Sequence, residues 1–169
     1  MRTFKEESLK ETKLQADLMS KPSYQQAHQH LIIFCHDVFI ETDKGILLVK
    51  RLKEPATNVW WPIGGRVLRG ERIEASLQKK SREECGLELE GIQLLDYART
   101  WFEGDPFGHG QGTDTINAVC FARGYGALKL DKFHESPAFI HPENKTNFGV
   151  LHPYVEHYLD EIWRQNYNY

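Results

Sequence analysis

The chain has 169 residues, a length typical of one domain with its own hydrophobic core. Its formal net charge of -3 argues against a general attraction to nucleic acid or to an anionic membrane, so we expect neither as a partner. No apolar run approaches the roughly 20 residues of a membrane span, and the first twenty residues carry too much charge for a secretory signal. Cys35, Cys85 and Cys120 are widely spaced and odd in number, which favours reduced thiols and a cytoplasmic protein.

The N-terminal third predicts a helix followed by a β-hairpin. Residues 4–18 hold good helix formers and leucines at roughly helical spacing, so we expect a helix within an extension of about residues 1–25. The segment SKPSY at 20–24 is interpreted as the end of that helix. Residues 30–42 and 46–51 are rich in β-branched and aromatic residues and are separated by DKG, which indicates two antiparallel strands.

The rest of the chain alternates between loops, strands and helices. Residues 52–65 contain two prolines and are expected to form a loop, and residues 71–85 are expected to form a helix that ends at Gly86. Residues 92–102 and 115–124 predict two further strands, joined by a long loop rich in glycine. A C-terminal amphipathic helix is expected over 148–163, beginning near Pro153. This order of elements predicts an α/β fold with a mixed sheet flanked by helices.

The helix at 71–85 carries charge where an amphipathic helix would be apolar. Helical steps from Ile73 and Leu77 lead to Lys80 and Glu84, so charged groups occupy the end of the inward-facing side. Carboxylate and backbone oxygens brought together by a glycine loop suit Mg²⁺ or Mn²⁺. The alternative is an exposed helix end that pairs Lys79 with Glu83 and Lys80 with Glu84.

The same helix and its preceding loop resemble a known motif. The Nudix box is G-x5-E-x7-R-E-U-x-E-E-x-G-U, where U is a bulky apolar residue. The matching positions are Gly65, Glu71, Glu83, Glu84, Gly86 and Leu87, and the register has no gaps. Three positions depart: Lys79 replaces the usual arginine, Lys80 replaces the first metal-binding glutamate, and Ser81 replaces an apolar residue. The chain is similar to the Nudix family, which implies one Nudix-type domain over 1–169.

The departure at Lys80 bears on the expected reaction. An ammonium in place of a carboxylate removes two ligand oxygens, so fewer metal ions can be held. Within the family, the GGRV and GTD segments resemble the GDP-mannose mannosyl hydrolases, which implies that water attacks the sugar carbon of a nucleoside-diphosphate sugar. Two alternatives remain open. The protein is an ordinary Nudix hydrolase of the diphosphate bond with Glu83 as base, or it is a decayed domain that only binds a nucleotide or a partner.

This resemblance assigns roles residue by residue. The Gly64 carbonyl and the Glu84 carboxylate are expected to bind Mg²⁺, with Glu83 as a second candidate ligand. Arg51 and Arg66 are expected to hold the diphosphate leaving group, because a guanidinium presents a planar fork to phosphate oxygens. Asp37 corresponds to an aspartate that contacts the sugar.

The catalytic base is expected among the histidines. His134 lies where the subgroup has its base, on a loop after the late strands, and a neutral imidazole suits this task. Phe133 stands where the subgroup has a metal-binding glutamine. His109, in the glycine-rich loop, is the competing candidate. The aromatic candidates for stacking on a base are Trp60, Trp61, Trp101 and Phe107.

Two apolar segments also favour a homodimer. Leu9, Leu14 and Leu18 lie in the expected N-terminal helix, and residues 154–169 are rich in tyrosine and tryptophan, which are common at subunit contacts. A twofold pair is the commonest way to cover such a surface. The alternative is that both segments pack on their own sheet.

Overall fold

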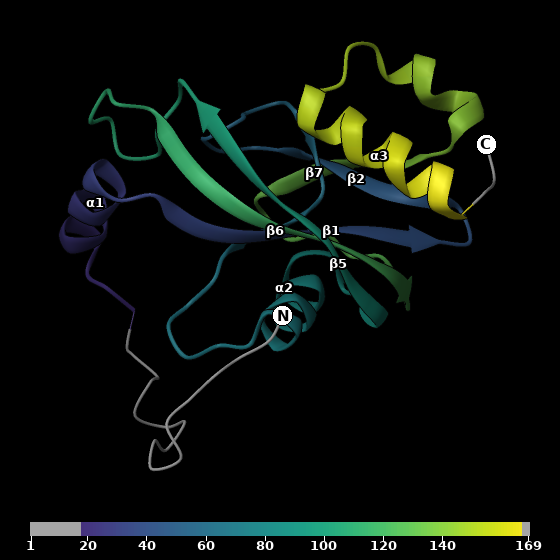
Figure 1. The fold of residues 1–169 in the computed structure, drawn as a ribbon, viewed down its shortest axis with the longest axis horizontal. Helices are drawn as coiled ribbons and strands as arrows, with labels where there is room; N and C mark the ends of the chain where they lie inside the picture. The colour runs from purple at the N-terminus through teal and green to yellow at the C-terminus, as the bar shows by residue number, and fades with distance from the viewer. Residues whose placement is uncertain (1–17, 167–169) are drawn as a thin grey trace.

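The fold is a mixed sheet between helices, seen in a computed structural model that describes residues 18–166 (Figure 1). Its strands are β1 (Ile33–Thr42), β2 (Gly45–Arg51), β3 (Trp60–Trp61), β4 (Ile63–Arg66), β5 (Glu88–Phe102), β6 (Thr113–Tyr125) and β7 (His134–Ile140). Its helices are α1 (Lys21–His30), α2 (Ile73–Cys85) and α3 (Pro153–Asn166), with a 3-10 helix η2 at Pro142–Phe148. In these described residues the strands follow the order β3-β2-β1-β6-β5, while β4 pairs with β1 and β7 with β2.

Strand β1 is the centre of the sheet. It pairs antiparallel with β2, where Ile40 faces Leu47, and parallel with β6, where Asp37 faces Val119. The parallel pair brings the N-terminal ends of β1 and β6 to the same end of the sheet. The expected hairpin and mixed sheet are confirmed, although the first strand begins at Ile33 because α1 occupies the residues before it.

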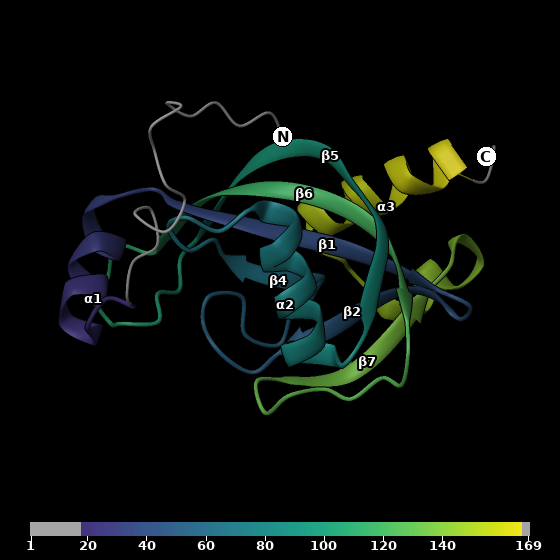
Figure 2. The same cartoon turned by 90° about the horizontal axis from the view of Figure 1, so that it is seen from below.

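Helices cover both faces of the sheet, as Figure 2 shows with α2 in front and α3 behind. On the α2 face, Leu77 packs in one buried cluster with Val38 and Ile40. On the α3 face, Leu159 and Ile162 belong to a second buried cluster. Phe39 of β1 also belongs to this second cluster, so alternate residues of β1 face opposite cores, and the expected mixed sheet flanked by helices is confirmed.

Helices α2 and α3 form where the sequence predicted them. Helix α2 ends at Gly86, whose φ of 75° is the left-handed conformation that glycine adopts freely, and whose N–H donates to the Ser81 carbonyl at 2.9 Å. Helix α3 begins at Pro153 as expected, because a proline fits the first turn. No described helix is long and apolar enough to span a membrane.

The helix expected over 4–18 lies outside the described residues apart from Leu18. The sequence did not predict α1, which begins within the SKPSY segment because Ser20 accepts a hydrogen bond from the Ser23 N–H and Pro22 occupies the first turn. A proline stops a helix in its interior but not at its start.

Two later predictions also need correction. Residues 52–65 are not all loop, since β3 and the start of β4 lie there and pair with β2 and β1. His134 is not on a loop; it is the first residue of β7, which pairs with β2. These strands are short and gain their hydrogen bonds from distant partners, which a local pattern does not reveal.

Candidate functional site

A cavity of about 210 Å³ opens at the N-terminal ends of β1 and β6. Asp37 from β1, Arg51 from β2 and Arg66 from β4 all line it. Asn117 and three threonines of β5 and β6 provide further polar groups, with Asn117 donating to the Thr100 hydroxyl at 3.0 Å. The structure therefore brings together three of the residues expected to bind substrate.

Asp37 is buried in this cavity rather than exposed on an edge strand. Its carboxylate accepts a hydrogen bond from the Tyr154 hydroxyl at 2.7 Å. Burial raises the pKa of Asp37 to about 6, because the charged form loses its hydration. A Cβ on Gly64 would collide with this carboxylate and with the His36 carbonyl, so only glycine allows β4 to pass here.

Arg51 and Arg66 bring two guanidinium groups to the same cavity. The Nε of Arg51 is buried and donates no hydrogen bond to any described residue. The Arg66 guanidinium lies over the Tyr24 ring, 3.9 Å from its centroid, so α1 covers it from outside. A buried donor without a partner costs free energy, and an anionic ligand would satisfy it.

Glu84 is a buried carboxylate of helix α2. Lys80 Nζ donates to its Oε1 at 3.0 Å, and its Oε2 is buried with no hydrogen bond to the described residues. Burial raises the pKa of Glu84, while the nearby Lys80 ammonium opposes that effect. Glu83 is exposed, so the two adjacent glutamates face different ways. Of the alternative ion pairs, Lys80 with Glu84 is confirmed, but Lys79 lies 3.7 Å from Glu71.

These residues fit a single divalent ion. The orphaned Glu84 Oε2 is a free carboxylate oxygen, and the Gly64 carbonyl comes from the strand beside it. Within residues 18–166, no group of three or more histidine, cysteine, aspartate or glutamate side chains is arranged to hold a metal. If Mg²⁺ or Mn²⁺ bound here, substrate and water oxygens would have to complete its coordination.

His134 forms a pair with Asp131 beside this helix. His134 Nδ1 lies 2.8 Å from Asp131 Oδ1. An ionised carboxylate only accepts, so Nδ1 carries the proton and Nε2 is left as an acceptor. The Asp131 N–H donates to the Glu84 carbonyl at 3.0 Å, and His134 faces Arg51 in the β2–β7 register. Attraction to a protonated His134 ring would lower the pKa of Glu84, so the two side chains lie within electrostatic reach of each other. The expected base therefore lies near the expected metal ligand and diphosphate ligand.

His109 is less suited to act as a base. Its Nε2 lies 2.8 Å from His28 Nδ1, and its Nδ1 accepts from the Gln111 N–H at 3.2 Å. Both ring nitrogens are engaged, so the histidine instead joins α1 to the loop between β5 and β6, which lie side by side in Figures 1 and 2. Phe133 offers no metal ligand and lies under Lys53 Nζ at 4.0 Å.

Only one of the four aromatic candidates lines the cavity. Trp61 is buried and stacks on Tyr154, with ring centroids 4.9 Å apart and planes 9° from parallel. The other three candidates, Trp60, Trp101 and Phe107, do not line it. Sequence reasoning missed Tyr24, His28, Phe102, Thr100 and Asn117, all of which line the cavity. The GTD segment, Gly112 to Asp114, marked the start of β6 and was the available signal for the last of these.

A series of side-chain hydrogen bonds lies on the opposite face of β1 from this cavity. His36 Nε2 lies 2.8 Å from the Ser76 hydroxyl, which donates to Glu71 at 2.9 Å. Burial lowers the pKa of His36 to about 4. This series attaches β1 to the start of α2 and so fixes the helix that carries Glu84.

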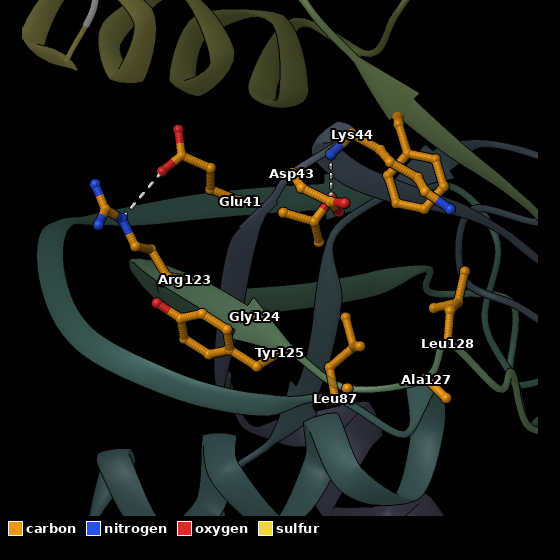
Figure 3. Close-up of a pocket in the computed structure, with 12 residues that line it drawn as sticks. Glu41, Asp43, Lys44, Leu87, Arg123, Gly124, Tyr125, Ala127 and Leu128 are labelled. Carbon is orange, nitrogen blue, oxygen red and sulfur yellow. Dashed lines mark hydrogen bonds and ion pairs between the residues drawn. The ribbon is translucent and has the colours of Figure 1, made fainter.

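A larger cavity, of about 570 Å³, lies at the other end of β1 and β6 (Figure 3). Three of its charged side chains have neighbours: Arg123 Nε lies 3.4 Å from Glu41, and Lys44 Nζ lies 5.7 Å from the centre of the Phe139 ring. None of the expected site residues lines it. It therefore does not bring the predicted chemistry together.

Comparisons with known proteins identify the family and the fold. The NUDIX domain family model matches residues 34–149. Low-salt glycan biosynthesis protein Agl8 of Haloferax volcanii is 28% identical over 144 residues, covering 75% of this chain and 79% of that protein. The crystal structure of a MutT NUDIX hydrolase from Burkholderia pseudomallei has a TM-score of 0.64 and 22% identity, covering 78% of this chain and 98% of that one. The NUDIX domain of Shewanella oneidensis NrtR, complexed with ADP ribose, has a TM-score of 0.63 and 14% identity, covering 88% and 100%.

Proposed function

The chain belongs to the Nudix hydrolase family, and we propose that it hydrolyses a nucleoside-diphosphate sugar such as GDP-mannose to a nucleoside diphosphate and a free sugar. The observation that carries this proposal is the Asp131–His134 pair beside Arg51, because it supplies an oriented imidazole next to an arginine expected to bind the diphosphate. Two relatives add support. One is named for glycan biosynthesis, and the other was crystallised with ADP ribose, a nucleoside diphosphate that carries a sugar.

The proposed reaction begins at His134. Its Nε2 takes a proton from water while the water oxygen bonds to the anomeric carbon of the sugar. The bond between that carbon and the phosphate oxygen breaks, and its electron pair stays on the diphosphate. Asp131 stabilises the imidazolium that forms, and the proton then passes to solvent.

The leaving group gains negative charge as this bond breaks. Arg51 and Arg66 donate charge-assisted hydrogen bonds to its oxygens, which strengthen in the transition state. Glu84 and the Gly64 carbonyl would hold Mg²⁺ or Mn²⁺, which supplies further positive charge to the diphosphate. Asp37 offers its carboxylate to a sugar hydroxyl, since it lies buried in the cavity that also holds Arg51.

Hydrolysis in oxygen-18 water tests the proposal. We expect the label in the sugar, detected by mass spectrometry, because water attacks carbon. Label in a phosphate product instead indicates ordinary diphosphate hydrolysis. In that reaction the base would be Glu83, which is exposed and lines a second cavity together with Lys80. No product over long incubation, with binding that does not need Mg²⁺, indicates a domain that binds without catalysis.

We also propose that the protein is a homodimer. The C-terminal segment does not support a dimer, because the apolar side of α3, including Tyr158 and Trp163, is buried within the chain. The N-terminal segment was expected to contribute three leucines. Of these only Leu18 lies within the described residues, and its exposed fraction is 68%. Phe34 and Tyr97 form a further exposed aromatic pair, 6.4 Å apart. Light scattering at micromolar concentration tests this proposal, and a monomer mass that persists at tenfold higher concentration ends it.

A cytoplasmic location is the remaining proposal. Cys35, Cys85 and Cys120 are free thiols, and burial raises the pKa of Cys35 and Cys120 to about 12. Thiols with such pKa values stay protonated and unreactive. Localisation of a tagged chain by fluorescence microscopy tests the proposal.

A further inference from the structure

Lys80 lies at the centre of the expected metal site. Its Nζ is 3.0 Å from Glu84 Oε1. A Cβ on Gly65 would lie 3.8 Å from the same nitrogen, so the ammonium lies against strand β4, which carries Gly64 and Arg66. The two groups expected to bind a metal therefore already have a cation of the protein beside them.

A cavity of about 380 Å³ opens next to this ammonium. Arg66, Lys79 and Lys80 line it together with Glu71 and Glu83. Arg66 also lines the 210 Å³ cavity, so one guanidinium borders both hollows. A substrate whose sugar occupies the smaller cavity can thus extend its diphosphate past Arg66 toward Lys80.

Lys80 and Lys79 differ in what they can offer to that diphosphate. The Lys80 side chain is 33% exposed and its partner Glu84 is buried, so its charge acts where water screens weakly. The Lys79 side chain is 56% exposed and lies 3.7 Å from Glu71. The neighbouring lysine is therefore a matched control with the same charge and a more solvated position.

We infer that Lys80 is a diphosphate ligand, which with Arg66 binds phosphate oxygens and competes with a divalent cation for Glu84. This inference deepens the proposed function and rests on its substrate class. An ammonium donates charge-assisted hydrogen bonds to phosphate, so it neutralises charge that a metal ion would otherwise neutralise. A cation on Glu84 Oε2 would also repel the ammonium on Oε1, so each weakens the other.

Two binding measurements test the inference without catalysis. Pyrophosphate binding is measured by calorimetry in EDTA, and Mn²⁺ binding by electron paramagnetic resonance. We expect Lys80→Met to weaken pyrophosphate binding about tenfold and to tighten Mn²⁺ binding severalfold. Lys80→Arg should keep pyrophosphate binding, and Lys79→Met should change it less than about twofold. Circular dichroism confirms that each variant is folded.

The inference is overturned if wild type binds no pyrophosphate in EDTA, if both methionine variants lose the same affinity, or if Lys80→Met leaves Mn²⁺ binding unchanged. These results are separate from the labelled-water experiment. If Lys80→Met behaves as expected while the label enters phosphate, the diphosphate ligand stands and the proposed attack on carbon falls. If label enters the sugar but Lys80→Met binds pyrophosphate normally, the attack on carbon stands and the role of Lys80 as a diphosphate ligand falls.

Discussion

The two cavities at opposite ends of β1 and β6 differ in size and in how their polar groups are satisfied. The larger, of about 570 Å³, has its arginine paired with Glu41. The smaller, of about 210 Å³, holds the unpartnered Arg51 Nε and the buried Asp37. Of the three buried side-chain atoms without a partner among the described residues, Arg51 Nε and Glu84 Oε2 belong to the expected site, and the third is His36 Nδ1 on the opposite face of β1. Polar satisfaction, rather than volume, therefore distinguishes the site.

The largest expected effect is at Glu84. Glu84→Gln removes the charge that would hold Mg²⁺, and we expect turnover of the nucleotide sugar to fall about a thousandfold. The matched control is Glu83→Gln, which changes an exposed neighbour and should cost less than about tenfold if water attacks carbon. Steady-state release of nucleoside diphosphate measures both. A Glu84→Gln variant with more than a tenth of wild-type turnover refutes the metal assignment.

The adjacent His36 and Asp37 should give opposite dependences of stability on pH. The pKa of Asp37 is raised from 3.8 to about 6, so between these values the folded state binds more protons and stability falls as pH rises. The pKa of His36 is lowered from 6.5 to about 4, so the unfolded state binds more protons there and stability rises with pH. The two contributions cancel over most of the window from pH 4 to 6.

Single variants separate these two contributions. In Asp37→Asn the free energy of unfolding should rise with pH more steeply than in wild type, by up to about 1.4 kcal/mol per pH unit between pH 4 and 6. In His36→Gln the free energy of unfolding should instead fall as pH rises, relative to wild type, by a similar amount per pH unit. Urea unfolding at several pH values measures both, and variants that keep the wild-type slope contradict the assigned pKa directions.

A smaller effect is expected at Asp131, which we regard as a positioning residue. Asp131→Asn keeps an oxygen that can accept from the Phe133 N–H, now at 2.8 Å, but loses the charge that orients His134. We expect kcat to fall between about tenfold and a hundredfold with KM little changed. Nitrogen-15 NMR of the imidazole should report a proton on Nδ1 in wild type and a mixture of tautomers in the variant. An unchanged tautomer together with full activity excludes this role.

The smallest effect is expected in the larger cavity. Arg123→Met removes an exposed partner of Glu41, and we expect turnover to change less than about twofold and stability by less than about 0.5 kcal/mol. Arg51→Met, its counterpart in the smaller cavity, should lower kcat/KM at least a hundredfold. Parallel kinetics of both variants test the comparison directly, and equal losses would remove the distinction between the cavities.

The sequence predicted the elements with strong local signals. The hairpin of β1 and β2 and the helix α2 carry clear periodicity and end signals, such as the DKG turn and Gly86. It did not predict β4 and β7, because their few residues are strands only through pairing with β1 and β2. It did not predict α1 either, because a proline that would end a helix from its interior is also accepted in the first turn, where Pro22 lies.

The candidate site was predicted only where the resemblance assigned a residue. Glu84, Arg51 and Arg66 follow from the resemblance, and the structure brings both arginines to one cavity. Tyr24 comes from α1 and Asn117 from β6, far away in sequence from the box. Their contribution depends on how distant segments meet, which no local pattern encodes.

The hydrogen bond from Tyr154 to Asp37 joins residues 117 positions apart. A ribosome releases β1 long before α3, so Asp37 is synthesised early and meets its hydroxyl donor late. A nascent chain that has reached β7 can already pair every described strand, yet its central carboxylate still lacks the Tyr154 hydroxyl and the Trp61 ring still lacks its stacking partner. Because α3 is translated last, the side of the cavity formed by Asp37 and Trp61 is one of the last parts of the protein to reach its final packing.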